Sequence, residues 1–107
     1  MTHTAVKIVV ITEKVILEGV VEIIDAAGAS GYTVVNAGGK GSRGIRTQSR
    51  AQVVDALRNV KIEVICSSRE QAEEIAENVS AKYFKNYSGI TYLEGVEILR
   101  PGKFSPK

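Results

Sequence analysis

A chain of 107 residues is long enough to enclose one hydrophobic core and too short for two good ones. Its composition, 44% hydrophobic and 24% charged, is typical of a soluble globular protein, and no apolar run approaches the roughly 18 residues that span a bilayer. A net charge of +2 argues against a generally basic nucleic-acid-binding protein. The first ten residues carry neither the positive start nor the cleavage site of a secretory signal, so these features together favour the cytoplasm.

The first predicted element is a strand over residues 5–11, which is β-branched and apolar on both faces and therefore suited to burial on two sides. Thr12 is a candidate N-cap for a following helix, with Glu13 in the first turn, where the helix dipole favours an acid. Apolar residues then recur at the i, i+3, i+4, i+7 spacing of one amphipathic face: Leu17, Val20, Val21 and Ile24. Gly28 is expected to end this helix.

A second strand is predicted over residues 32–36, opened by Gly31, and it runs into a glycine-rich stretch. After that stretch, Val60, Ile62 and Val64 alternate with charged residues, which predicts a strand with one dry and one wet face. The single cysteine, Cys66, follows directly. Without a second cysteine it can form no intramolecular disulfide and no cysteine-based metal site, so we expect a buried, unreactive thiol at a strand end.

Ser67 stands three residues before Glu70, a capping-box spacing that predicts the start of a second helix. The inward face of this helix is formed by Ala72, Ile75, Ala76, Val79 and Tyr83. Its carboxylates at Glu73, Glu74 and Glu77 are interpreted as a solvated face, because no metal ligand or second acidic motif accompanies them. A last strand is predicted over residues 90–99, in which Gly95 is a candidate bulge, and residues 100–102 end it.

Strand, helix, strand, loop, strand, helix, strand is the order of the ferredoxin-like βαββαβ sandwich, an α+β fold. We therefore expect one domain over residues 1–107, with one four-stranded antiparallel sheet and two helices on one face. The doubly apolar first strand needs a cover on its other face. In a chain this short the expected cover is another copy of the same chain, which predicts an oligomer.

The glycine-rich stretch at residues 38–46 reads GGKGSRGIR, and it begins a segment with four cations and no acid: Lys40, Arg43, Arg46 and Arg50. Residues 39–44 match G-x-G-x-x-G after a strand, the pattern of a dinucleotide-binding turn. That pattern should open a helix at once, whereas residues 45–50 are polar and show no apolar stripe. The stretch also lacks the spacing of a P-loop.

Two interpretations of this stretch remain open. One is a solvated loop whose charges serve solubility. The other is an anion site, in which glycine backbone N–H groups turn inward as a nest, Ser42 adds a hydroxyl and Lys40 adds a point charge. Arg43 and Arg46 could each offer paired donors to phosphate oxygens. No nucleophile or general base stands nearby, so the chemistry favours binding over turnover.

Several segments together resemble the SbtB family, P-II-like signalling proteins associated with the cyanobacterial bicarbonate transporter SbtA. The segments are ITEK at residues 11–14, GYTVVNAGGKGSR at 31–43, KYF at 82–84 and YSGI at 87–90. The resemblance runs in matching order from about residue 7 to residue 99, and the combination of GYTV, GGKGSR and KYF is specific.

The resemblance implies a trimer of ferredoxin-like subunits that binds the adenine nucleotides AMP, cyclic AMP, ADP and ATP in clefts between neighbours. A long T-loop, at about residues 41–55, would engage the SbtA transporter at the inner membrane, and residues 100–107 would form a short tail. The implied nucleotide-binding residues are Thr33, Val34, Gly39, Lys40, Gly41, Ser42, Arg43, Arg46 and Gly89. Among them, Arg43 and Arg46 would hold phosphate, and the backbone near Thr33, Val34 and Gly89 would lie around the base and ribose.

One departure from the family bears on activity. Some members carry a C-terminal cysteine pair that is linked to slow nucleotide hydrolysis, and this chain has no cysteine after Cys66. The absence of this pair argues against hydrolysis, so a regulatory binding protein that is no enzyme is the expectation, and a nucleotide phosphohydrolase using the same cleft is the alternative. A metal sensor is a weaker alternative, because His3 is the only histidine and a lone terminal histidine is a poor ligand set.

Overall fold

The computed structural model describes residues 2–38 and 58–99. Its elements are β1 (His3–Glu13), the short 3₁₀ helix η1 (Lys14–Ile16), α1 (Leu17–Ala26), β2 (Thr33–Ala37), β3 (Asn59–Cys66), α3 (Arg69–Tyr83) and β4 (Gly89–Ile98). The four strands form one antiparallel sheet in the order β2-β3-β1-β4. The α+β, ferredoxin-like fold class is therefore confirmed.

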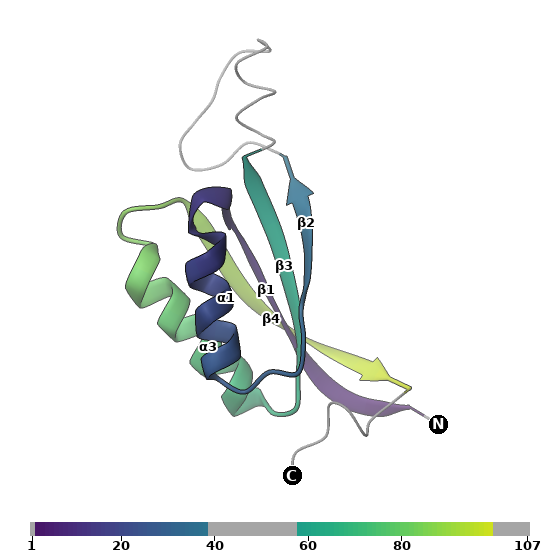
Figure 1. The fold of residues 1–107 in the computed structure, drawn as a ribbon. Coiled ribbons are helices and arrows are strands. Elements are labelled where there is room, and N and C mark those ends of the chain that lie inside the picture. Colours follow the sequence, from purple (N-terminus) through teal and green to yellow (C-terminus); the bar gives the residue numbers. More distant parts are fainter. Residues whose placement is uncertain (1, 39–57, 100–107) are drawn as a thin grey trace.

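Both helices lie on the same face of the sheet, side by side (Figure 1). The core fills the space between them and the strands, and β3 alternates buried and half-buried residues along its whole length, as its sequence predicted. The fully buried side chains of this core come from β1, α1, β3 and α3: Ile8, Val10, Val20, Ile24, Val60, Ile62, Val64, Cys66, Ala72, Ile75 and Val79.

Cys66 has no exposed surface, and its burial raises the pKa of the thiol to about 11. Desolvation disfavours the thiolate, which is the reactive form of cysteine. The prediction of a buried thiol at a strand end is confirmed, because Cys66 is the last residue of β3.

The two helix starts differ from the sequence-based expectation. Ser68, not Ser67, is the N-cap of α3, and its hydroxyl accepts a hydrogen bond from the backbone N–H of Gln71 at 3.1 Å. The Oε1 atom of Gln71 in turn accepts a hydrogen bond from the backbone N–H of Ser67 at 3.0 Å, so the two side chains satisfy two backbone N–H groups around the helix start.

At the first helix the expected N-cap is wrong. β1 continues through Thr12 and Glu13, η1 follows, and α1 begins only at Leu17 with no side-chain cap. Thr12 lies inside the strand and not at a cap position, and its hydroxyl donates to the carbonyl of Ser88 at 2.7 Å. The far end of α1 is as expected, since Gly28 adopts a left-handed φ of +84° just beyond it.

β4 pairs with β1 in one constant register over ten positions, from His3 opposite Ile98 to Thr12 opposite Gly89. The candidate bulge at Gly95 is therefore wrong: Gly95 lies opposite Val6 without any slip in the pairing. The pairing of β3 with β1 ends at Val6. The start of β1 and the end of β4 therefore extend beyond β3 as a two-stranded arm near the N-terminus (Figure 1).

The second face of the sheet carries no helix in the part of the chain that the structure describes (Figure 1). Val9, on this face, is already fully buried by its neighbours, but Val35, Ile90 and Tyr92 remain 50%, 58% and 37% exposed. Three exposed apolar side chains on one sheet face indicate a surface suited to burial against another molecule.

Charged side chains interrupt this open face. The ammonium of Lys7 lies 3.3 Å from a carboxylate oxygen of Glu94 and 3.6 Å from one of Glu63, and Lys61 approaches Glu63 at 3.3 Å. The hydrogen bond to Glu94 is the main cause that raises the pKa of Lys7, and burial opposes it. These charges compensate one another across β3, β1 and β4, so the open face can be covered without leaving any of the four unpaired.

Candidate functional site

The candidate site is the end of the sheet from which the glycine-rich segment departs. The register sets Asn36, Val60, Thr12 and Gly89 in one row across β2, β3, β1 and β4. β2 therefore ends, and β3 and β4 begin, at the same end of the sheet (Figure 1). Residues 39–57, which contain most of the predicted phosphate site, lie outside the described residues.

The chain returns from that segment at Arg58, directly beside the end of β1. The backbone N–H of Lys14 donates to the carbonyl of Arg58 at 2.6 Å. Both side chains are exposed. Two cationic residues therefore lie at this end of the sheet, next to the place where the basic segment rejoins the fold.

The turn between α3 and β4, residues 84–88, lies at the same end and is firmly tied. The backbone N–H groups of Asn86 and Tyr87 both donate to the carbonyl of Tyr83, at 3.1 and 3.0 Å. The rings of Tyr83 and Tyr87 meet edge to face with their centroids 6.2 Å apart. Tyr83, Phe84 and Tyr87 are half-buried against the core, and the predicted inward position of Tyr83 is confirmed.

The backbone of Ser88 is held by the end of β1 through both its N–H and its carbonyl. Thr12 donates its hydroxyl to the Ser88 carbonyl at 2.7 Å, and a carboxylate oxygen of Glu13 accepts from the Ser88 N–H at 2.6 Å. Sequence reasoning assigned both residues to a helix start and missed this role. A usable signal was present: Thr12 continues the inward positions of Ile8 and Val10, and a buried hydroxyl needs a partner.

Gly89 follows at the first position of β4, where the space for a side chain is already occupied. A Cβ atom there would overlap the ring of Phe84 and lie 2.9 Å from the Thr12 hydroxyl. Close packing therefore favours glycine at this position, in addition to its predicted place in a nucleotide site. Thr12, Phe84 and Gly89 form one compact contact at the root of the turn.

The structure does not bring the described nucleotide-site residues together within one chain. Thr33 lies in the row of Glu63, Val9 and Tyr92, on the opposite edge strand from Gly89. Three strand spacings of about 4.8 Å and three positions of about 3.3 Å along the strands separate Thr33 from Gly89 by roughly 17 Å. A single small ligand touches both residues only if they come from different copies of the chain.

Thr33 and Val34 also point to opposite faces of β2. Val34 lies opposite Ile62 on the helix side and lines a hollow of about 390 Å³ between α1 and the edge strand. That hollow is lined by Leu17, Glu18, Val21, Glu22, Tyr32 and Val34. Thr33 lies opposite Glu63 on the open face instead. Because their side chains lie on opposite faces, Thr33 and Val34 can both contact one ligand only through their backbone atoms.

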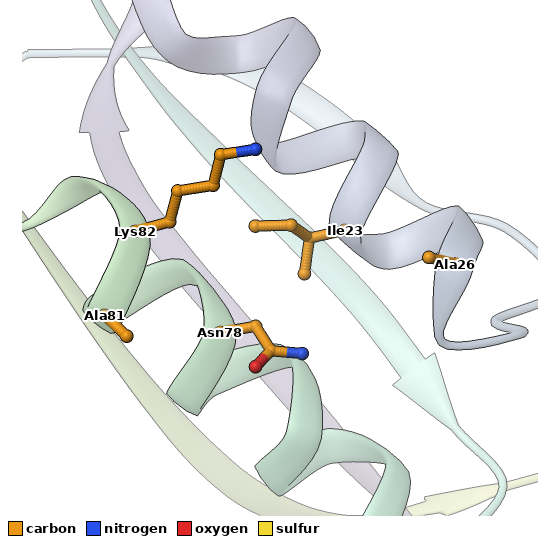
Figure 2. Close-up of a pocket in the computed structure, with 5 residues that line it drawn as sticks. All are labelled: Ile23, Ala26, Asn78, Ala81 and Lys82. Carbon is orange, nitrogen blue, oxygen red and sulfur yellow. The ribbon is translucent and has the colours of Figure 1, made fainter.

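A second hollow, of about 400 Å³, lies between the two helices. Figure 2 shows Asn78 and Lys82 of α3 directed toward α1, with Ile23 projecting between the helices. Its remaining lining residues are Ala26 and Ala81, whose small side chains leave the space open. None of the predicted site residues lines this groove, so it is separate from the candidate site.

The helices flanking the groove are held together on either side of it. The amide of Gln71 donates to the carbonyl of Ala27 at 3.1 Å, and the hydroxyl of Tyr83 packs against the backbone of Gly19. A Cβ atom at position 19 would overlap that hydroxyl, so the glycine lets the Tyr83 side chain approach α1 closely.

In the described part of the chain, no group of three or more histidine, cysteine, aspartate or glutamate side chains could hold a metal ion. Among the same residues, no helix combines the length and the apolar character needed to cross a membrane.

Comparison with known proteins gives one family and several solved structures. The family model of the nitrogen regulatory protein P-II matches residues 5–103. A PII-like protein from Thermus thermophilus is 31% identical, with a TM-score of 0.76, over 96% of this chain and 97% of that one. The PII-like protein CPII from Thiomonas intermedia K12, bound to ADP and bicarbonate, is 27% identical, with a TM-score of 0.78, over 97% of each chain.

A further structure of CPII, bound to ADP, AMP and bicarbonate, superposes with a TM-score of 0.80 at 23% identity, over 99% of this chain and 98% of that one. The full-length match of architecture agrees with the sheet order and helix placement described above.

Proposed function

This chain belongs to the P-II family, and from that premise we propose that it senses adenine nucleotides bound in clefts between the subunits of a trimer. P-II proteins are signalling proteins and not enzymes, which sets aside the phosphohydrolase alternative. P-II proteins are also trimers. The proposed ligands are AMP, cyclic AMP, ADP and ATP, and the chain is taken as one domain over residues 1–107.

The observation that carries this proposal is the separation of Thr33 from Gly89. Both are predicted to lie around the base and ribose, yet they occupy opposite edge strands of one sheet. A cleft between two copies is the arrangement that reconciles the prediction with the fold. The open sheet face, with its exposed Val35, Ile90 and Tyr92, supplies a surface through which copies can associate.

The ligand class is supported by two independent features. The segment between β2 and β3 carries Arg43 and Arg46 among glycines, a composition suited to phosphate oxygens. CPII, which matches this chain at 27% identity over nearly its full length, was solved with ADP and bicarbonate bound.

A nucleotide would act through differential stabilisation. A ligand that binds one arrangement of the T-loop, at about residues 41–55, more tightly than another shifts their populations, whereas affinity common to both shifts nothing. The proposed signal is therefore the difference in loop arrangement between nucleotides, and not nucleotide binding as such.

Titration calorimetry with AMP, cyclic AMP, ADP and ATP tests the binding proposal. Arg46→Ala is expected to weaken ADP binding about 10- to 150-fold, because a charge-assisted contact contributes about 1.5–3 kcal/mol. Arg50→Ala is the matched control, since Arg50 lies in the same basic segment but outside the proposed site. Undiminished affinity in Arg46→Ala, or no binding of any of the four nucleotides by the wild type, would refute the proposal.

We further propose that the partner is a membrane bicarbonate transporter of the SbtA type, engaged through the T-loop in inorganic carbon acclimation. The protein would then be cytoplasmic and reach the inner membrane only through that transporter. The support is the GYTV, GGKGSR and KYF combination of the sequence. Co-purification from membranes is expected with the transporter co-expressed, and lost on deletion of residues 41–55. Equal recovery of the deletion variant contradicts this partner.

A further inference from the structure

The turn of residues 84–88 is tied to the end of β1 by an ionisable side chain. Glu13 Oε2 accepts from the backbone N–H of Ser88 at 2.6 Å, across 75 positions of sequence. Both residues are half-buried. A hydrogen bond to an ionised carboxylate is roughly twice as strong as one between neutral groups, so this contact is a strong constraint on the turn.

The same end of β1 also holds the other segment that borders the candidate site. Glu13 binds Ser88, and the next residue, Lys14, donates its N–H to the carbonyl of Arg58 at 2.6 Å. Two consecutive residues therefore tie the turn before β4 and the point at which the chain returns from the glycine-rich segment. The end of β1 sets where these two segments lie relative to each other.

We propose that Glu13 is a positioning residue for nucleotide binding, which holds the 84–88 turn and Gly89 in the geometry that receives the ligand. This inference rests on the function proposed above. Glu13 acts through Ser88 and does not touch the nucleotide. A turn that is ordered before binding loses less conformational freedom when the ligand arrives, and the affinity is correspondingly higher.

The positioning role and direct contact with the phosphates predict opposite signs for the change in ADP affinity. A carboxylate that touched the phosphates of a nucleotide would repel them, so its removal would tighten binding. A carboxylate that positions the turn through Ser88 would, when removed, weaken binding. The sign of the change in ADP affinity therefore discriminates between the two roles.

Two substitutions separate the reach of the side chain from its charge, and a third, Glu13→Ala, removes both. Glu13→Gln keeps an oxygen acceptor at the same distance and loses the charge. Glu13→Asp keeps the charge, but its carboxylate is one methylene shorter and withdraws from the Ser88 N–H. Glu77→Ala is the matched control, because Glu77 is an exposed carboxylate on α3 that lines neither hollow.

Two measurements on the full-length protein form the test: ADP affinity by calorimetry and hydrogen exchange of the Ser88 amide by NMR. Glu13→Asp and Glu13→Ala are expected to speed Ser88 exchange and to weaken ADP binding by about 10-fold, the loss of one charge-assisted bond. Glu13→Gln is expected to stay within about 3-fold of the wild type, since an amide oxygen still accepts, and Glu77→Ala is expected to change neither quantity.

The outcomes are distinguishable. Faster Ser88 exchange with unchanged or tighter ADP binding overturns the positioning role and leaves the proposed function standing. Unchanged Ser88 exchange in Glu13→Asp overturns the contact itself. A wild-type protein that binds no adenine nucleotide overturns the proposed function and this inference with it.

Discussion

Alanine in place of Gly89 is expected to lower the free energy of unfolding by about 1–3 kcal/mol, the usual range for overpacking. The added methyl group would overlap the ring of Phe84 and crowd the hydroxyl of Thr12, which is itself committed to Ser88. The Thr12 hydroxyl cannot move away without losing its hydrogen bond to Ser88, and the ring of Phe84 is packed against the core. Urea unfolding at one fixed protomer concentration measures the change, because the stability of an oligomer depends on concentration.

Gly95→Ala is the matched control for this experiment. Gly95 lies on the same strand, and a Cβ atom there meets nothing within 4 Å. Its replacement is expected to be neutral or to stabilise by up to about 1 kcal/mol, since alanine restricts the unfolded chain. Placing Gly89→Ala in a Phe84→Ala background should reduce its cost, and an undiminished cost would show that the ring is not the obstacle.

Ile62→Ala is expected to lower the free energy of unfolding by about 2–5 kcal/mol, the range for deleting a large buried aliphatic side chain. Ile62 is fully buried at the centre of β3 and belongs to the core beneath the helices. The same urea experiment measures the loss. The substitution leaves a cavity beside β3. This cavity can close only in part, because β2 and β1 hold the strand on both sides.

Val15→Ala serves as the comparison, because Val15 is 75% exposed and its truncation is expected to change stability by no more than about 0.5 kcal/mol. A loss below about 1 kcal/mol for Ile62→Ala would mean that the core rearranges around the substitution, against the close packing described here.

The fold was predictable because buried residues recur at regular short intervals along each strand and helix. Val60, Ile62 and Val64 reveal the inner face of β3 from their alternation alone, and Ala72, Ile75 and Val79 reveal that of α3. Such a pattern can be recognised in the sequence without knowing which residues these side chains pack against. The four-stranded antiparallel sheet and the placement of the helices on one face followed from the number and order of the elements along the chain.

The local ends were less predictable because their partners are distant in the sequence. Thr12 has the composition of a helix cap, but its hydroxyl binds a carbonyl 76 positions away. The capping residue of α3 lies one position later than expected, since Ser67 and Ser68 are both followed three residues later by a residue with a carboxyl or amide side chain. Gly95 suggested a bulge, whereas it stands in an unbroken ladder.

Less of the candidate site than of the fold could be predicted from the sequence of a single chain. A phosphate-binding role for the glycine and arginine residues between 39 and 46 was predicted from their composition, and it remains a prediction because these residues lie outside the described part of the chain. Thr33 and Gly89 could be named but not related to each other, because their relation depends on the arrangement of copies. Glu13 was overlooked because a carboxylate that binds one backbone N–H across the fold leaves no periodic pattern.

The placement of β1 between β3 and β4 has a consequence for the order in which the protein acquires its structure. Every ladder contact of β1 reaches across at least 46 positions, the distance from Glu13 to Asn59. The central strand therefore has no neighbour until much of the polypeptide has been synthesised, and it remains without its second neighbour until β4 leaves the ribosome. Chain closure over such separations is slow, so the apolar N-terminal strand passes through a vulnerable interval in which it must avoid other nascent chains.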